Sequence, residues 1–298
     1  MSQMAKATGN AADEKRFAEV AAKVKKAMLD HYTDASGRFL CDSLAYGNGE
    51  GYVDGNLGFS GHTQTAYANA IYMNIIKPSA VQSAGNFLAD LIKQNGGKLA
   101  TGFLGAKPLL PALSASGHSD AAYDLFLSKE FPSWGFEVEN GSTTIWERWD
   151  SYTKEDGFKY NAAMNSFNHY AFGAICEWMF GNAAGIQPTQ AGFTEFEIKP
   201  EIDTRSGTGR INSLRASFHS IAGEIISGRE KRAGALSMSV KVPVNTTAKI
   251  FVPAKEGNII HINGKRADLP SQKNLCDQKT GTVIFDVGSG TYMIEVLD

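Results

Sequence analysis

The chain has 298 residues, 43% of them hydrophobic, and its 29 lysines and arginines nearly balance its 31 aspartates and glutamates. A net charge of −2 provides no basic field for nucleic acid or an acidic membrane surface, and the length allows one large core or two moderate ones. Three scattered cysteines exclude a disulfide framework, and six histidines at no ligand-like spacing imply neither a metal site nor an organic cofactor.

The first half of the chain is predicted to form helices joined by Gly-containing loops. Between Asp13 and His31 apolar residues recur every three or four positions, which predicts an amphipathic helix capped by Asp13. Further helices are predicted at Thr63–Ile76, Ser79–Gln94, Lys107–Ser116, Ser119–Leu127 and Asn165–Phe180. About half a dozen helices in this arrangement are typical of stacked helix pairs.

A Gly-rich run from Tyr46 to Gly61 is predicted to be a long loop between the first two helices. Polar and aromatic side chains in and just before it either line the mouth of a site or are ordinary loop residues. These residues are Asp42, Glu50, Tyr52, Asp54 and Phe59.

Near residue 188 the apolar pattern changes to a period of two, which predicts strands. The predicted strands are Leu214–His219, Gly223–Arg229, Leu236–Val242, Ala248–Val252, Ile259–Ile262, Thr282–Val287 and Thr291–Val296. Asn263-Gly264 predicts a tight hairpin. Short strands separated by Gly, Pro and Asn predict an antiparallel β-sandwich without a catalytic constellation.

The stretch 140–152, N-G-S-T-T-I-W-E-R-W-D-S-Y, places charged side chains between two indoles. Sugars need this combination, because their C–H faces stack on aromatic rings and their hydroxyls bind charged groups, while glycoside cleavage needs a carboxylate. Glu147 is the first catalytic candidate. On the alternative interpretation Trp146 and Trp149 cover a core, and Glu147 and Arg148 are solvated or ion-paired.

Several segments, in order, resemble the C-terminal part of bacterial α-L-rhamnosidases. They are G-H-T-Q-T-A-Y at 61–67, T-G-F-L-G at 101–105, F-P-S-W-G-F-E-V at 131–138, G-S-T-T-I-W-E-R-W-D-S at 141–151 and N-S-F-N-H-Y-A-F-G-A-I-C-E-W at 165–178. The resemblance covers essentially the whole chain. It implies an inverting glycoside hydrolase that acts on rhamnose-containing glycosides or oligosaccharides and uses no cofactor.

The same resemblance implies a multi-domain α and β protein. Residues 1–187 would form an incomplete (α/α)6 toroid of helix pairs, and residues 188–298 a C-terminal antiparallel β-sandwich. A closed toroid needs about twice the predicted number of helices. We therefore expect exposed apolar helix faces, through which the chain could self-associate.

The resemblance also suggests roles for individual residues. Glu147 matches the general base of the family, and His169 matches a sugar-binding histidine, although a lone helical histidine is more often structural. Arg148 either keeps Glu147 ionised or points away from it, since adjacent side chains do not share a face. Trp134, like the two indoles beside Glu147, is a stacking surface, a pocket wall or plain core.

The chain departs from the family in lacking the upstream acidic segment that carries the general acid. Glu137, Glu139, Asp150 and Asp54 are the nearest carboxylates, and their spacing favours none of them as a substitute. We therefore expect weak or no hydrolysis by this chain alone. The alternatives are a non-catalytic, sugar-binding or self-associating remnant, or another enzyme built on helix pairs, which explains W-E-R-W and N-H-Y less well.

No transmembrane run and no signal-peptide core is present in these residues. As written, the chain is expected to be soluble and untargeted. Its first ten residues resemble the inside of a family helix rather than a protein start, which leaves localisation open.

Overall fold

The computed structural model describes residues 1–40, 62–158, 165–267, 276–277 and 281–298. Backbone contacts divide the chain into two compact units, Met1–Gly173 and Ala174–Asp298. The loop predicted at Tyr46–Gly61, its candidate lining residues Glu50, Tyr52, Asp54 and Phe59, and Asp42 before it lie outside the described residues. No helix among the described ranges is long and apolar enough to cross a membrane.

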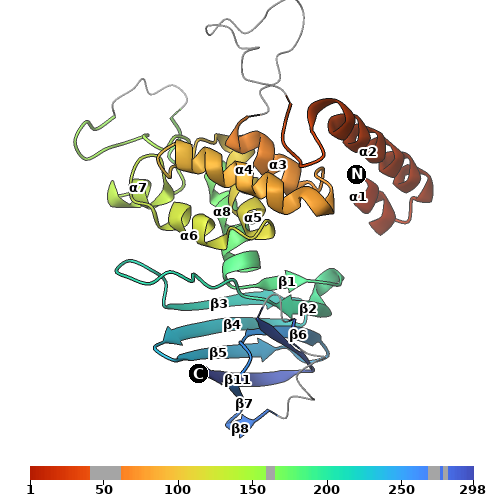
Figure 1. Ribbon diagram of the computed structural model, residues 1–298, viewed down its shortest axis with the longest axis vertical. Helices are drawn as coiled ribbons and strands as arrows, with labels where there is room; N and C mark the ends of the chain where they lie inside the picture. Colours follow the sequence, from red (N-terminus) through yellow and green to blue (C-terminus); the bar gives the residue numbers. More distant parts are fainter. Residues whose placement is uncertain (41–61, 159–164, 268–275, 278–280) are drawn as a thin grey trace, which may run out of the picture. The chain divides into compact units, whose positions relative to one another are not determined.

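The first unit consists of helices (Figure 1). The helices are α1 Ser2–Ala7, α2 Ala11–Tyr32, α3 Gln64–Tyr72, η3 Pro78–Ala80, α4 Val81–Gln94, α5 Phe103–Ala115, α6 Ser119–Leu127 and α7 Trp134–Glu139. Helix α5 packs against α3, α4 and α6 and buries Leu109, Leu110 and Leu113 completely. This apolar side of α5 forms the centre of the helical core.

Helix α2 confirms the predicted amphipathic helix but not its cap. Asn10 precedes the helix, and its side-chain Oδ1 accepts a hydrogen bond from the amide of Asp13 at 3.1 Å. Asp13 instead lies in the first turn, where its charge is favourable to the helix dipole. No residue of α2 is buried.

The single helix predicted at Asn165–Phe180 is wrong. Helical structure begins only at Ala171 and passes through three short segments, η4 Ala171–Ala174, α8 Ile175–Trp178 and the π-helix η5 Met179–Ala183. The preceding residues 165–170 are not helical, because their backbone groups bond to a different segment, as described below.

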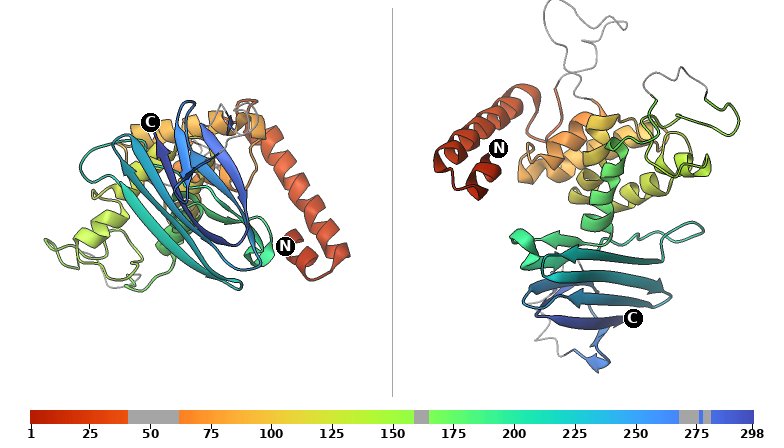
Figure 2. Two further views of the ribbon diagram at one scale, coloured as in Figure 1. Left: turned by 90° about the horizontal axis from the view of Figure 1, so that it is seen from below. Right: turned by 180° about the vertical axis from the view of Figure 1, so that it is seen from behind.

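The second unit contains two β-sheets that share one core (Figures 1 and 2). The five-stranded sheet has the order β1-β2-β6-β10-β9, and the six-stranded sheet β3-β4-β5-β11-β7-β8. Their strands are β1 Ile186–Pro188, β2 Glu195–Ile198, β3 Ser213–Ser220, β4 Gly223–Arg232, β5 Ala235–Val242, β6 Thr247–Pro253, β7 Ile259–Ile262, β8 Lys265–Arg266, β9 Cys276–Asp277, β10 Thr282–Val287 and β11 Gly290–Leu297.

The strand pattern agrees with the predicted sandwich. On β5, Met238, Val240 and Val242 alternate into the core, as a period of two requires. Asn263 and Gly264, with φ of 51° and 76°, form the predicted turn between β7 and β8. One pair of strands, β2 and β6, is parallel, whereas the other strand pairs described are antiparallel.

Candidate active site

The segment that contains Glu147 is paired with the segment that contains His169. The Glu147 amide donates to the Ser166 carbonyl at 2.9 Å, and the Ser166 amide donates in return to Glu147 Oε2 at 2.8 Å. Two residues away, the His169 amide donates to the carbonyl of Ile145 at 2.9 Å. This ladder uses the backbone of residues 166–169, which explains why they do not join the following helix.

The Glu147 side chain is thereby fixed through one oxygen only. Oε2 accepts the Ser166 amide, while Oε1 makes no hydrogen bond to any residue in the described ranges. The side chain is half-buried. A carboxylate held in this way keeps a free oxygen that can accept a proton from a water molecule.

An aromatic cluster lies on the same segments. Trp149 stacks on Phe172 with ring centroids 3.8 Å apart, and Trp134 meets Trp149 edge to face at 5.1 Å. The indole N–H of Trp134 donates to the Phe172 carbonyl at 2.9 Å. Trp146 lies edge to face with Phe167 at 5.4 Å. All three tryptophans are buried, so in this chain they pack as a wall rather than as open stacking surfaces.

His169 is half-buried between two rings. Its imidazole stacks on Phe103 at 4.6 Å and on Tyr170 at 5.5 Å, and Tyr170 itself is 89% exposed. The amide of Ala171 donates to His169 Nδ1 at 3.4 Å, and in the tautomer with Nδ1 as the acceptor the ring proton lies on Nε2. In that tautomer Nε2–H is the donor that a sugar hydroxyl needs.

Arg148 forms an ion pair with Asp150 at 3.2 Å. The turn that carries both is closed by Ser151, whose hydroxyl accepts from the Arg148 amide at 3.2 Å and donates to its carbonyl at 3.0 Å. The W-E-R-W stretch is therefore a hydrogen-bonded turn, and its cation is directed to Asp150.

The sequence analysis named Glu137 as one of four carboxylates and favoured none of them, yet the structure distinguishes it by its burial. It is only 2% exposed, its Oε1 makes no hydrogen bond to a described residue, and burial raises its pKa to about 8. A signal was available, because Trp134 and Glu137 are three apart on α7 and so share a helix face. Glu139 is exposed and pairs with Lys129, which lowers the pKa of Glu139.

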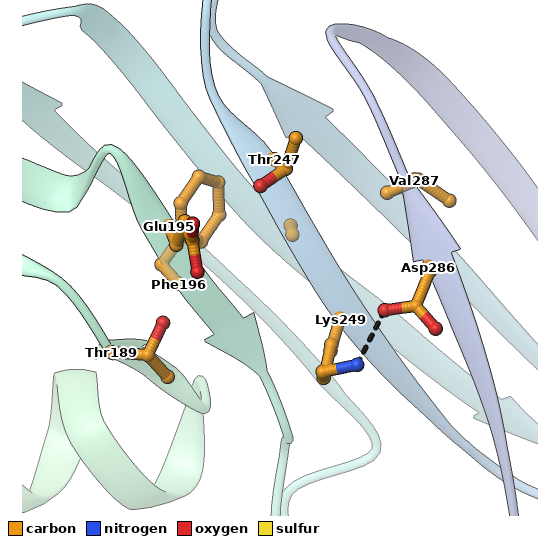
Figure 3. Close-up of a pocket in the computed structure, with 8 residues that line it drawn as sticks. Thr189, Glu195, Phe196, Thr247, Lys249, Asp286 and Val287 are labelled. Atoms are coloured by element: carbon orange, nitrogen blue, oxygen red, sulfur yellow. Dashed lines mark hydrogen bonds and ion pairs between the residues drawn. The ribbon is translucent and has the colours of Figure 1, made fainter.

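A cavity of about 400 Å³ lies elsewhere, on the five-stranded sheet of the second unit (Figure 3). Its lining includes Glu195, Thr247 and the ion pair between Lys249 and Asp286. None of the predicted site residues lines it. Within the described ranges, no group of three or more His, Cys, Asp or Glu side chains is placed to hold a metal ion.

A unit of helices followed by a unit of two β-sheets with one shared core defines the fold class, and a carboxylate anchored among aromatic rings is a feature that glycoside cleavage needs. The model of the bacterial alpha-L-rhamnosidase 6 hairpin glycosidase domain matches residues 1–183, and that of the bacterial alpha-L-rhamnosidase C-terminal domain matches residues 185–267. The chain therefore belongs to the bacterial α-L-rhamnosidase family, as the resemblance predicted, and the predicted fold class is confirmed.

Individual relatives agree with this assignment. An α-L-rhamnosidase of Streptomyces avermitilis is 39% identical over 82% of this chain, and one of Formosa agariphila is 36% identical over 72%. The crystal structure of the Streptomyces avermitilis enzyme complexed with L-rhamnose superimposes with a TM-score of 0.78 at 33% identity over 99% of this chain. That of the Aspergillus terreus enzyme superimposes with a TM-score of 0.74 at 26% identity over 99%. The chain spans only 22% of each of the two relatives compared by sequence, and 25% and 28% of the two crystallised chains.

Proposed function

We propose that Glu147 is the general base of an inverting α-L-rhamnoside hydrolysis. The observation that carries the proposal is the one-sided anchoring of its carboxylate, with Oε2 on the Ser166 amide and Oε1 free. Oε1 would take the proton of the water that attacks the anomeric carbon. A general base of this kind acts in its charged form.

The sugar would be held beside this carboxylate. His169 would donate Nε2–H to a hydroxyl, and the wall of Trp134, Trp146 and Trp149 would exclude water behind the site. Arg148, through Asp150, would keep the turn rigid. Rhamnose as the sugar is supported by the Streptomyces avermitilis relative, whose structure was determined with L-rhamnose.

An inverting enzyme also needs a protonated carboxyl about 6.5–9.5 Å from the base. Within the described ranges Glu137 is buried, Glu139 pairs with Lys129, and Asp150 pairs with Arg148. We therefore propose that the general acid lies outside the described residues. Without it, the chain would lose the factor of about 10²–10⁴ that general acid catalysis supplies.

The test is hydrolysis of an aryl α-L-rhamnoside by the wild-type chain, by Glu147→Gln and by Glu155→Gln, an exposed glutamate, as the matched control. We expect a slow rate that Glu147→Gln abolishes and Glu155→Gln preserves, with the first-formed sugar, followed by NMR, having the inverted anomeric configuration. A rate unchanged in Glu147→Gln, or retention of configuration, would refute the proposal. Should the chain alone show no rate, the same variants are compared after fusing the chain behind the N-terminal part of the Streptomyces avermitilis relative.

A second, non-catalytic function is favoured by α2. Its apolar positions face solvent, with Val20 51% and Val24 56% exposed. We propose that two copies of this chain associate through this face, because exposed apolar surface favours self-association. Light scattering coupled to size exclusion would show a dimer for the wild type and a monomer for the double variant Val20→Lys and Val24→Lys. A wild-type monomer at high concentration would refute it.

A further inference from the structure

The segment T-G-F-L-G at 101–105 brings one aromatic ring to the candidate active site. Phe103, the first residue of α5, stacks on His169 with ring centroids 4.6 Å apart and ring planes 18° apart. The same ring meets Phe172 at 5.2 Å, and Phe172 stacks in turn on Trp149. Phe103 therefore joins the imidazole of His169 to the aromatic cluster around the W-E-R-W stretch.

Helix α3 holds the chain just before Phe103. Gln64, the first residue of α3, is only 3% exposed, and its side-chain amide bonds to the backbone in both directions. Its Nε2 donates to the Lys98 carbonyl at 3.0 Å, and its Oε1 accepts the Ala100 amide at 2.8 Å. A buried amide that is satisfied as donor and as acceptor fixes the backbone that it binds.

Helix α3 also holds the chain just after Phe103. Asn69 Nδ2 donates to the Leu104 carbonyl at 3.1 Å. A Cβ added to Gly105 would lie 2.4 Å from Thr65 Oγ1, so α5 approaches α3 closely at this point. The backbone on both sides of Phe103 is thus attached to one helix, which fixes where the ring leaves the chain.

The His169 imidazole has few other restraints. Its Nδ1 accepts the Ala171 amide at 3.4 Å, which is long for a hydrogen bond, and Nε2 makes none to a residue in the described ranges. Tyr170, the other ring that stacks on it, is 89% exposed. The stack on Phe103 is therefore the contact best placed to fix the plane of the imidazole.

We propose that Phe103 is a positioning residue for sugar binding, which holds the His169 imidazole in the plane from which Nε2–H reaches a sugar hydroxyl. Gln64 and Asn69 hold Phe103 in turn. The inference rests on the proposed role of His169. It predicts that position 103 needs a flat ring rather than apolar bulk, so tyrosine meets the need and leucine does not.

The experiment follows the His169 ring protons by NMR in the whole chain, with ¹³C-labelled histidine and with the signal identified by its loss in His169→Gln. The ring current of Phe103 shifts protons over its face upfield. We therefore expect Phe103→Leu to move the His169 signal downfield, and Phe103→Tyr to leave it close to its wild-type position. Leu104→Ala is the matched control, because Leu104 is the neighbouring residue and is 82% exposed.

Titration with L-rhamnose then tests whether the position of the ring matters for binding. The wild-type His169 signal should move with the sugar, and the apparent Kd should be about threefold to tenfold weaker in Phe103→Leu, because a side chain that is not held beforehand must be ordered on binding. Phe103→Tyr and Leu104→Ala should keep the wild-type Kd.

An unmoved His169 signal in Phe103→Leu, or an L-rhamnose Kd equal to that of the wild type, overturns the inference, as does a Phe103→Tyr that behaves like Phe103→Leu. A wild-type signal that does not respond to L-rhamnose instead overturns the sugar-binding role of His169, so the two failures are distinguishable. If Phe103→Leu does not fold, nuclear Overhauser effects between the rings of Phe103 and His169 are measured in the wild type. Their presence supports the inference, and their absence overturns it.

Discussion

Replacing Glu137 with glutamine should change how the stability of the helical unit depends on pH. In the folded chain the pKa of Glu137 is raised from 4.5 to about 8, chiefly by burial. The unfolded chain releases this proton near pH 4.5, whereas the folded chain keeps it until about pH 8. Between these values unfolding releases a proton, so the stability of the wild type falls as pH rises.

The size of the effect follows from the pKa shift. One unit corresponds to about 1.4 kcal/mol, so this carboxyl costs the folded state about 5 kcal/mol by pH 8 relative to pH 4.5. Below pH 4.5 it costs nothing, and above pH 8 its contribution no longer changes. Because Glu137 is 2% exposed, solvent screens little of this difference.

The assay is urea unfolding between pH 5 and 9, monitored by tryptophan fluorescence, since Trp134, Trp146 and Trp149 lie in this unit. Glu137→Gln should become increasingly more stable than the wild type as pH rises through this range. Glu139→Gln is the matched control, because the pKa of Glu139 is lowered by Lys129. Parallel pH curves for the wild type and Glu137→Gln would refute the reasoning.

Three further substitutions test packing by the same unfolding assay or by hydrogen exchange. Gly135→Ala should lower the free energy of unfolding by about 2 kcal/mol, because the added Cβ would lie 2.3 Å from the carbonyl oxygen of Ser128. An unchanged free energy of unfolding would contradict the close approach of α7 to Ser128. Asn10→Ala should speed exchange in the first turn of α2 about fivefold, the loss of a helix cap worth about 1 kcal/mol. Trp149→Ala should lower the free energy of unfolding by about 3–5 kcal/mol, because it removes the stack on Phe172. A loss below about 1 kcal/mol would show that the aromatic cluster around Trp149 is loosely packed.

Much of the fold was predictable because local signals agree with tertiary structure. The apolar period of α2 and the Asn263-Gly264 turn each follow from rules that act within a few residues. The parallel pair β2 and β6 was not predictable, since strand order depends on contacts between residues far apart in sequence.

The site shows the same division. The W-E-R-W and N-H-Y motifs, through their resemblance to the family, predicted Glu147 and His169 as site residues. The structure places the segments that carry them side by side. The helix predicted from Asn165 failed because its apolar spacing carries no information about a carboxylate 19 residues earlier that binds the Ser166 amide. The only sequence signal for the burial of Glu137 was its spacing of three residues from Trp134. A glutamate is rarely buried, so its charge predicted an exposed side chain instead.

The pairing of Glu147 with Ser166 also bears on how such sites can diversify. The carboxylate is fixed at the two ends of an excursion, by residues 145–147 on one side and 166–169 on the other. Within this excursion residues 153–157 close a turn of their own, because the Thr153 amide donates to the Gly157 carbonyl at 3.1 Å and the Gly157 amide donates to the Thr153 carbonyl at 2.8 Å. Neither of these bonds involves the residues that hold Glu147, so substitutions in the 153–157 turn are the natural way to vary the chain near this segment without releasing the carboxylate.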